Sequence, residues 1–282
     1  MIRVAMGQMK VEGNKVSENL SRAVGMIELA AKRGHDLIVL PECLDIGWTC
    51  QDANVLAGQI PGEISNVLCQ SAKTQNIYVV AGLTEKSNGR LYSSALLISP
   101  QGAVLLKHRK INILRIARHI YSIGRTLSVV ETELGNIGIP ICADNFPNSH
   151  AIAHALARMG ADVILSPCSW AVPPNHDNRI KPYGDMWERS YVRIARLFNI
   201  PIVGVSNTGT IESGPWKDYR CIGCSLAVSA EGRILIKGEY SHTEQSLLSV
   251  DVELAKNKKV GTEISDMLEE KVVDSGLITD CI

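Results

Sequence analysis

A weak internal repeat constrains the fold of this chain more than any single motif does. The segment 31–41 matches 157–167, and each copy reads as the end of a helix, a glycine and a buried strand. Three more pairs of segments match in the same order along the chain: 2–8 with 137–143, 76–82 with 199–205, and 95–107 with residues from Leu226 onward. Self-similarity of this kind predicts a repeated architecture.

Each half of the repeat reads as strand, helix, strand, helix and three further strands. One helix is indicated by apolar residues at helical spacing, and a second is expected over 183–199; the apolar set of the first is Leu20, Ala23, Val24, Ile27 and Ala31. Apolar sheets with helices on one side bury their other face best against each other. We therefore predict an α/β fold, a four-layer α-β-β-α sandwich with two pseudo-repeated halves. The alternative is two independent doubly wound domains, although no Pro-, Gly- or Ser-rich linker lies between 110 and 135.

The repeat also sets the predicted domain boundary. Residues 1–252 are assigned to the sandwich domain. The stretch 253–282 lies outside the repeat and is expected to form a tail that packs on the domain or on a neighbouring subunit.

The charge balance excludes several classes of partner. Lysine and arginine total 29, as do aspartate and glutamate, so the net charge is zero and no single-sign field attracts nucleic acid or an anionic membrane. No uncharged apolar run is long enough for a membrane span, and the first residues do not read as a signal peptide. Eight cysteines in 282 residues are too few for a disulfide scaffold. These features predict a cytoplasmic protein that acts on a small molecule.

Three chemically reactive side chains follow predicted strands. Glu42, Lys110 and Cys142 each come shortly after an apolar run. Because ligands of open α/β sheets bind outside the carboxyl ends of the strands, we expect the three to share one site. In the repeat register the counterpart of Glu42 is Cys168, so the two halves differ where reactive groups occur.

A thiol, a carboxylate and an ammonium together suit nucleophilic catalysis. A thiol, with an ordinary pKa of about 8.5, becomes reactive when a base removes its proton or a cation stabilises the thiolate. Glu42 is the candidate base and Lys110 the candidate cation. The N–H of Ala143 is placed to stabilise negative charge after attack. Residues 144–147 resemble a helix start, whose dipole favours a thiolate at Cys142.

Three motifs built on these residues resemble the signatures of the carbon-nitrogen hydrolase (nitrilase) superfamily. They are Leu40-Pro41-Glu42, Arg109-Lys110-Ile111-Asn112, and the segment from Gly138 to Pro147, and the similarity extends over about residues 2–252. The resemblance implies an α-β-β-α fold that assembles as a homodimer or higher homo-oligomer. It also implies a cofactor-independent triad that acts through a covalent intermediate. By position, Glu42 is the general base, Lys110 stabilises the tetrahedral intermediate and Cys142 is the nucleophile.

One segment departs from the family pattern. Many members carry a second glutamate after the lysine, where it positions the lysine and the substrate. Here the segment 111–124 contains Arg115, Arg118 and His119 and no acid. Either another residue replaces the glutamate, or activity is altered or lost. The basic cluster is either a solvated loop or a contact for a substrate carboxylate, and His119 is included among the candidate substrate-binding residues.

The residues after the cysteine indicate the reaction type. Nitrile-hydrolysing members tend to have Trp-Glu there, whereas Ala143-Asp144 is closer to the pattern of amidases and carbamoylases. We expect hydrolysis of a non-peptide C–N bond in a small linear amide or N-carbamoyl compound, with release of ammonia. The alternatives are nitrile hydrolysis by the same triad, acyl transfer to an amine, and a catalytically silent member that binds a metabolite.

Other residues near these motifs are candidates for binding the substrate. Cys168 and Trp170 follow the strand that matches the one before Glu42, and they join Ala143 in this role. Burial in the apolar core is the alternative explanation for both side chains.

Two further pairs of side chains have the spacing of metal ligands. Cys221 and Cys224 are spaced like a redox or zinc pair, but they open a predicted strand and lack a second pair. His150 and His154 lie one helical turn apart, but no third ligand is evident. The sequence therefore predicts no metal site and no cofactor.

Overall fold

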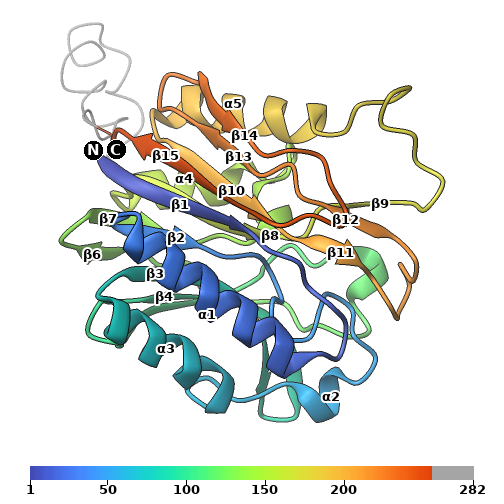
Figure 1. Cartoon of the computed structure of the whole chain (residues 1–282). Coiled ribbons are helices and arrows are strands. Elements are labelled where there is room, and N and C mark those ends of the chain that lie inside the picture. Colours follow the sequence, from blue (N-terminus) through green and yellow to red (C-terminus); the bar gives the residue numbers. More distant parts are fainter. Residues whose placement is uncertain (256–282) are drawn as a thin grey trace, which may run out of the picture.

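Two six-stranded sheets form the inner layers of the computed structural model, which describes residues 1–255 (Figure 1). The first sheet has the order β15-β1-β2-β3-β4-β5, with strands β1 (Ile2–Gln8), β2 (Leu37–Val39), β3 (Tyr78–Ser87), β4 (Arg90–Ile98), β5 (Val104–Arg109) and β15 (Ser246–Val252). The second has the order β14-β13-β10-β8-β7-β6, with strands β6 (Val130–Thr132), β7 (Gly135–Gly138), β8 (Val163–Cys168), β10 (Ile202–Ser206), β13 (Leu226–Val228) and β14 (Ile234–Lys237). A small third sheet contains β9 (Ala171–Val172), β11 (Thr208–Thr210) and β12 (Arg220–Ile222).

The topology of the two large sheets confirms the internal repeat. In the first sheet β1, β2 and β3 are parallel, and β4 and β5 then pair antiparallel. In the second sheet β7, β8 and β10 are parallel, and β13 and β14 follow antiparallel. Parallel neighbours need crossover connections, and in each half these contain the helices.

Helices cover the outer face of each sheet (Figure 1). Helices α1 (Val16–Lys32) and α3 (Glu63–Gln75) lie on the first sheet, and α4 (His150–Arg158) and α5 (Asp185–Phe198) on the second. The face of α1 that carries Ala23, Ile27 and Ala30 is buried against the first sheet, as its helical spacing predicts. The remaining helical elements are short: α2 (Ala53–Leu56) and the 3-10 turns η1 (Arg115–Ala117) and η2 (Cys142–Asn145).

One apolar core fills the space between the two sheets. Alternate residues of β1 divide between two environments: Val4 and Met6 belong to this inner core, whereas Ala5 packs with the residues beneath α1. Val39 of the first half and Leu165 of the second lie in the same core. The chain is therefore an α-β-β-α sandwich, and the alternative of two independent domains is wrong.

The last strand crosses from the second half back to the first sheet. β15 pairs antiparallel with β1 along its whole length, from Ile2 opposite Val252 to Gln8 opposite Ser246. This pairing covers the edge that β1 would otherwise expose. Strand β6 has the equivalent place in the second sheet, where it pairs antiparallel with β7, although the matching sequence segments included neither β6 nor β15.

The expected helix start at residues 144–147 is wrong. Cys142 to Asn145 form the single 3-10 turn η2, and the chain then becomes extended at Phe146 before α4 begins at His150. Pro147 lacks the N–H that a helix running on from η2 would use in its backbone hydrogen bonds. The dipole of a long helix therefore does not begin at Cys142.

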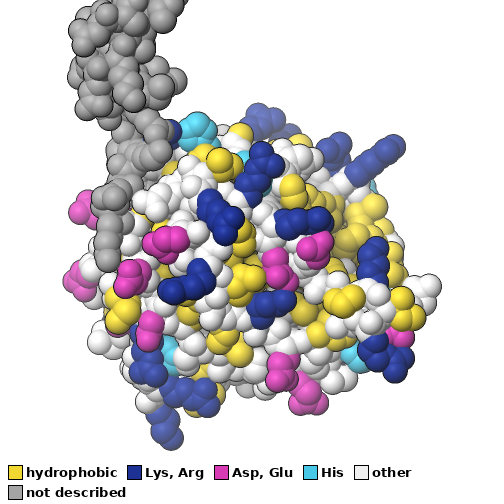
Figure 2. All heavy atoms as spheres, turned by 90° about the horizontal axis from the view of Figure 1, so that it is seen from above, with side chains coloured by type: hydrophobic (Ala, Val, Ile, Leu, Met, Phe, Trp, Pro, Cys, Tyr) yellow, Lys and Arg dark blue, Asp and Glu magenta, His cyan; other side chains and the backbone are white. Residues whose placement is uncertain are grey.

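The remaining fold-level expectations concern the tail, the membrane and the surface charge. Apart from residues 253–255, the predicted tail lies outside the described residues. No helix within residues 1–255 is long and apolar enough to cross a membrane. Figure 2 shows acidic and basic side chains interspersed over one face of the molecule, in keeping with the balanced composition.

Candidate active site

The three predicted reactive residues meet beyond the ends of their strands, between the two sheets. All are buried, with 1% of Glu42, 2% of Lys110 and 7% of Cys142 exposed, so Cys142 is the most exposed residue of the three. The N–H of Glu42 donates to the carbonyl of Cys168, its counterpart in the repeat, at 3.1 Å. The N–H of Lys110 donates to the carbonyl of Ser93 in β4 at 2.8 Å. The backbone thus places each side chain independently of its charge.

Lys110 and Glu42 form a buried ion pair. Lys110 Nζ donates to Glu42 Oε1 at 2.6 Å, and Ser93 Oγ donates to the same oxygen at 2.9 Å. Burial disfavours the ammonium, but the charge of Glu42 and its hydrogen bond outweigh this effect and raise the pKa of Lys110 above its usual value. Lys110 is therefore a cation near neutral pH.

The backbone of Cys142 is held in a conformation that is costly for a residue with a side chain. Its φ is +42°, in the left-handed region, and such strain of about 1–3 kcal/mol is typical of functional sites. The Cys142 N–H donates to Ser166 Oγ at 3.1 Å, which anchors the turn to β8. This turn presents the side chain at the end of β7.

The Cys142 thiol is protonated in the resting state. Burial and a hydrogen bond with Cys168 raise its pKa well above the ordinary value, and the nearby charge of Lys110 only partly opposes this effect. Because the thiol does not ionise by itself near neutral pH, its attack on a substrate needs a base that accepts the proton. Glu42 is the carboxylate available for this role.

Asp144 joins the cysteine turn to the lysine segment. Its Oδ1 accepts the N–H groups of Ile111 at 3.1 Å and Asn112 at 2.8 Å. Its Oδ2 accepts the N–H of Ile141 at 3.0 Å and lies 2.9 Å from Nε2 of the buried His108. A fully buried carboxylate with four partners fixes the relative position of the two segments that carry Cys142 and Lys110.

The predicted substrate-binding residues have environments that differ from one another. No hydrogen-bond acceptor for the Ala143 N–H lies within residues 1–255. Cys168 is buried, its Sγ being 3.5 Å from Ser166 Oγ and 3.6 Å from the Tyr191 hydroxyl. Trp170 is 2% exposed and stacks on Trp187.

The indole of Trp170 has an unused donor. Its ring lies 4.7 Å from that of Trp187 between centroids, yet its Nε1 is buried without a hydrogen-bond partner among the described residues. Trp170 and Cys142 belong to the same apolar cluster. A free donor in this environment suits a polar substrate atom, and the role of Trp170 stays a prediction.

His119 lies apart from the triad. It is exposed and lines a surface hollow with Gln51, Asn54 and Ile120, a lining that does not include Glu42, Lys110 or Cys142. Its predicted contact with substrate is therefore not supported by its position.

Segment 111–124 supplies no acid near Lys110 in place of the second glutamate of the family pattern. Within the described residues, the ammonium of Lys110 is hydrogen-bonded to Glu42 alone, and Asp144 is a further acid whose charge acts on it. Asp144 is therefore the acid that acts on Lys110 from outside the pair, and it comes from the cysteine motif.

The two pairs with metal-like spacing have other contacts. His150 Nε2 lies 3.3 Å from Ser190 Oγ, and His154 Nε2 accepts from Arg158 Nε at 3.0 Å. Cys221 lies 3.6 Å from Ser169 Oγ, and both Cys221 and Cys224 are free thiols. No group of three potential ligands is arranged for a metal ion in the part of the chain that the structure describes.

The sequence analysis did not identify three polar residues of the site. They are Ser93, Ser166 and Asp144, the last of which links the segments of Cys142 and Lys110. All three are buried and hydrogen-bonded to triad residues or to the segments that carry them. Ser166 interrupts the apolar strand β8, Ser93 and Ser94 interrupt the apolar part of β4, and a buried hydroxyl in a strand needs a partner. That interruption is the signal that could have identified them.

Gly82 is required by the close approach of Glu42. A Cβ built on Gly82 would lie 2.5 Å from the Cα of Glu42 and 2.7 Å from the carbonyl oxygen of Pro41. We expect Gly82→Ala to displace the backbone of the general base, to lower the free energy of unfolding by about 1–3 kcal/mol, and to reduce activity. Urea unfolding and ammonia release measure the two effects.

A matched glycine serves as the control. Gly25 lies in α1, and a Cβ added there would meet nothing within 4 Å, so Gly25→Ala should raise stability by about 0.5–1 kcal/mol and leave activity unchanged. If Gly82→Ala kept wild-type stability and activity, the close approach of Gly82 to the backbone of Glu42 would not be needed for function.

The chain matches a family model and curated relatives over most of its length. The model for carbon-nitrogen hydrolase matches residues 3–260. A nitrilase of Pyrococcus abyssi (strain GE5 / Orsay) is 28% identical over 277 residues, covering 96% of this chain and 97% of the relative. Omega-amidase NIT2 of Bos taurus is 28% identical over 275 residues, covering 93% and 92%.

Solved structures share the fold at lower identity. A carbon-nitrogen hydrolase from Helicobacter pylori G27 superposes with a TM-score of 0.80 at 20% identity, over 89% of both chains. A mutant of the amidase from Nesterenkonia sp. AN1, in which acrylamide has added to the active-site cysteine, gives a TM-score of 0.76 at 17% identity over 98% of both chains. Both confirm the arrangement of stacked sheets and helices.

Proposed function

Because the chain belongs to the carbon-nitrogen hydrolase family, we propose that it hydrolyses a small linear amide or N-carbamoyl compound through an acyl intermediate on Cys142. The observation that carries this proposal is the buried Lys110–Glu42 pair, 2.6 Å apart, whose charges act on the thiol of Cys142. A buried ion pair costs desolvation energy and contributes little net stability, so its presence is better explained by function than by folding.

The first half-reaction forms a thioester and releases ammonia. As the Cys142 sulfur attacks the substrate carbonyl carbon, the thiol proton passes to Glu42. Oε1 of Glu42 already accepts two hydrogen bonds, and no described residue hydrogen-bonds to Oε2, which leaves that oxygen for the proton. The Lys110 ammonium and the Ala143 N–H stabilise the oxyanion. Glu42 then returns the proton to the leaving nitrogen, the C–N bond breaks, and ammonia departs.

The second half-reaction restores the thiol. Water attacks the thioester carbon while Glu42 accepts one of its protons, a second tetrahedral intermediate forms, and the C–S bond breaks. The products are a carboxylic acid and the Cys142 thiol, which recovers the proton held by Glu42. One water is consumed and one ammonia is released per amide.

An amide is favoured over a nitrile for two reasons. Omega-amidases are prominent among the relatives, and Cys142 is followed by Ala143-Asp144 rather than Trp-Glu. An N-carbamoyl substrate needs the same steps, with an N-substituted carbamoyl group on the sulfur; water then releases a carbamic acid, which breaks down to carbon dioxide and an amine. Both remain within the proposal.

The test is an ammonia-release screen over linear amides, N-carbamoyl amines and nitriles, coupled to mass spectrometry of the intact protein. We expect ammonia from members of the first two groups and a mass increase equal to the acyl group on the peptide that contains Cys142. Hydroxylamine is added to trap the intermediate as a hydroxamate and to measure how it divides between water and an amine.

The outcomes separate the alternatives. Turnover of nitriles alone contradicts amide hydrolysis, and preferred transfer to hydroxylamine and other amines indicates an acyltransferase. No ammonia and no adduct from any compound in a broad panel would favour a silent, metabolite-binding protein.

A further inference from the structure

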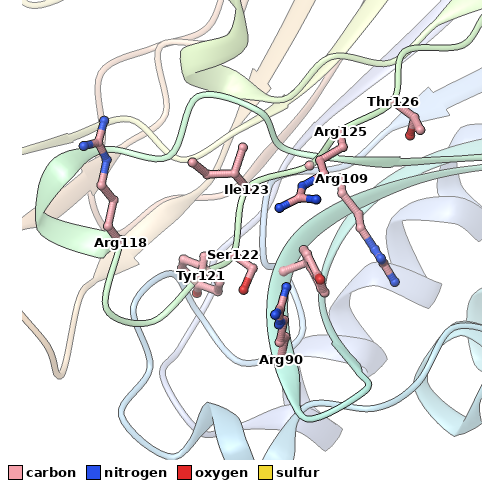
Figure 3. Close-up of a pocket in the computed structure, with 10 residues that line it drawn as sticks. Arg90, Arg109, Arg118, Tyr121, Ser122, Ile123, Arg125 and Thr126 are labelled. Carbon is pink, nitrogen blue, oxygen red and sulfur yellow. The ribbon is translucent and has the colours of Figure 1, made fainter.

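We propose that a hollow beside strands β4 and β5 is a binding site for a small phosphate-bearing molecule, distinct from the triad. The hollow has a volume of about 500 Å³, within the range of small-molecule sites, and the triad residues are not part of its lining. Four arginines surround it: Arg90, Arg109, Arg118 and Arg125. Arg90 comes from β4, Arg109 from β5, and Arg118 and Arg125 from the loop after η1, and Figure 3 shows Arg118 and Arg109 on opposite sides.

Three of these arginines have no protein partner. Within residues 1–255, the guanidinium groups of Arg90, Arg118 and Arg125 make no hydrogen bond or ion pair, and all three residues are exposed. By contrast, the exposed Arg179 pairs with Asp177 at 2.9 Å. The three groups are therefore available to a ligand.

The fourth arginine forms a rigid wall of the hollow. Arg109 donates to the two carboxylate oxygens of Glu85 at 2.8 and 2.6 Å and lies 4.0 Å over the ring of Tyr92. Glu85 also accepts from Lys107 at 2.7 Å. Burial opposes ionisation of Glu85, but bonds from Arg109, Lys107 and Ser94 lower its pKa to about 2, so it stays ionised. The single carboxylate of Glu85 is shared by the cations of Arg109 and Lys107, so positive charge is in excess here. The three unpaired arginines add to this excess.

The charge and geometry of the arginines indicate a phosphate group. Guanidinium groups donate two parallel hydrogen bonds to phosphate or carboxylate oxygens, and three unpaired arginines around one hollow favour an anion that carries more than one charge. A phosphate monoester carries about −1.5 to −2 near neutral pH, more than one carboxylate. The hydroxyl groups of Ser122 and Thr126 line the same hollow and add donors. The zero net charge of the chain disfavours a nucleic acid as the occupant.

The hollow is built on a loop that touches the neighbours of the triad. The N–H of Gly124 donates to the carbonyl of Lys110 at 2.8 Å. The hydroxyl of Tyr121 lies 3.8 Å from Sγ of Cys43, the residue that follows Glu42. An anion that draws the arginines together therefore acts on a loop in contact with the segments that hold the base and the lysine. The site is placed to adjust the geometry of the triad.

Calorimetric titration of the full chain with inorganic pyrophosphate tests the proposal. The protein carries Cys142→Ala in every sample, so the measurement does not depend on turnover, and the salt concentration is low. We expect saturable binding at one site per chain, weakened about tenfold by Arg118→Gln and about tenfold by Arg125→Gln, because each removes a charge-assisted contact. Rising sodium chloride should weaken binding steadily.

Arg115→Gln is the matched control. Arg115 is an exposed arginine of the same loop that does not line the hollow, so its variant should bind pyrophosphate as the parent does. Circular dichroism confirms that the variants keep the fold. Absence of binding, equal weakening by Arg115→Gln, or tighter binding of citrate than of pyrophosphate would overturn the assignment. Because the titration needs no catalysis, failure of the proposed hydrolase activity leaves this result unaffected.

Discussion

Cys142→Ala is expected to lower ammonia release from an amide substrate by about 10⁴-fold or more. Cys142 is the most exposed residue of the triad and lies at a strained turn beside the buried Lys110–Glu42 pair. Without the sulfur no thioester forms, and the remaining groups can only bind the amide and polarise its carbonyl. The measurement compares kcat/KM of variant and parent with the best substrate of the screen.

Cys69→Ala is the matched control for this variant. Cys69 is a free, partly exposed thiol on α3, outside the site, so its removal should leave activity unchanged. Iodoacetamide labelling, read out by peptide mass spectrometry with and without substrate, gives a second measurement. If ammonia release survives in Cys142→Ala and Cys142 resists alkylation while other cysteines react, Cys142 is not the nucleophile.

Glu42→Gln is expected to have the second large effect, on both activity and stability. Loss of the base should lower kcat by about 10³-fold, because the thiol of Cys142 is protonated at rest and needs an acceptor. The substitution also leaves the buried ammonium of Lys110 without the carboxylate that compensates its burial. We expect the free energy of unfolding to fall by about 3 kcal/mol. Urea unfolding and steady-state kinetics measure the two losses.

Two further variants separate the catalytic loss from the structural one. Glu12→Gln makes the same change in a partly exposed carboxylate that pairs with Lys10 and Arg22, and it should cost less than about 1 kcal/mol without changing kcat. Glu42→Gln combined with Lys110→Met removes both buried charges, and it should recover much of the stability but none of the activity. Recovered activity in the double variant would show that Glu42 acts by compensating Lys110 and not as a base.

The layers of the fold were predictable because the two halves of the chain repeat the same order of strands and helices. The matching segments 31–41 and 157–167 became β2 and β8 with the helix ends before them, and the two sheets repeat one strand order. The return of β15 to β1 was not predictable in this way. Its partner is more than two hundred residues earlier, and nothing in the local pattern of residues 246–252 distinguishes one sheet edge from the other.

The candidate site, like the fold, was predictable only in part. Glu42, Lys110 and Cys142 were identified from their residue type and their place after apolar strands, and the structure brings them together. The contacts that orient them come from residues whose partners are distant in the sequence, such as Ser166 beneath the Cys142 turn and Asp144 between the two segments. His119 was chosen from its sequence neighbourhood, and it faces another part of the surface.

The arginine hollow was also predictable only in part. The basic residues of segment 111–124 were visible in the sequence, and Arg118 was among them. Their significance changes because Arg90 and Arg109, from two paired strands, reach the same space.

Apolar periodicity, turn residues and repeated segments act over a few residues at a time, so the chain alone indicated the strands, the helices, the α-β-β-α class and the identity of the reactive groups. Strand pairing and the stacking of one sheet on the other decided the rest, because both are long-range packing events. Strand pairing within the first sheet places Lys110 2.6 Å from Glu42, 68 positions away in the sequence. Stacking of the second sheet then brings Cys142 to this pair and buries all three residues, where water screens their charges less. Distances, protonation states and the shape of the arginine hollow all follow from that packing.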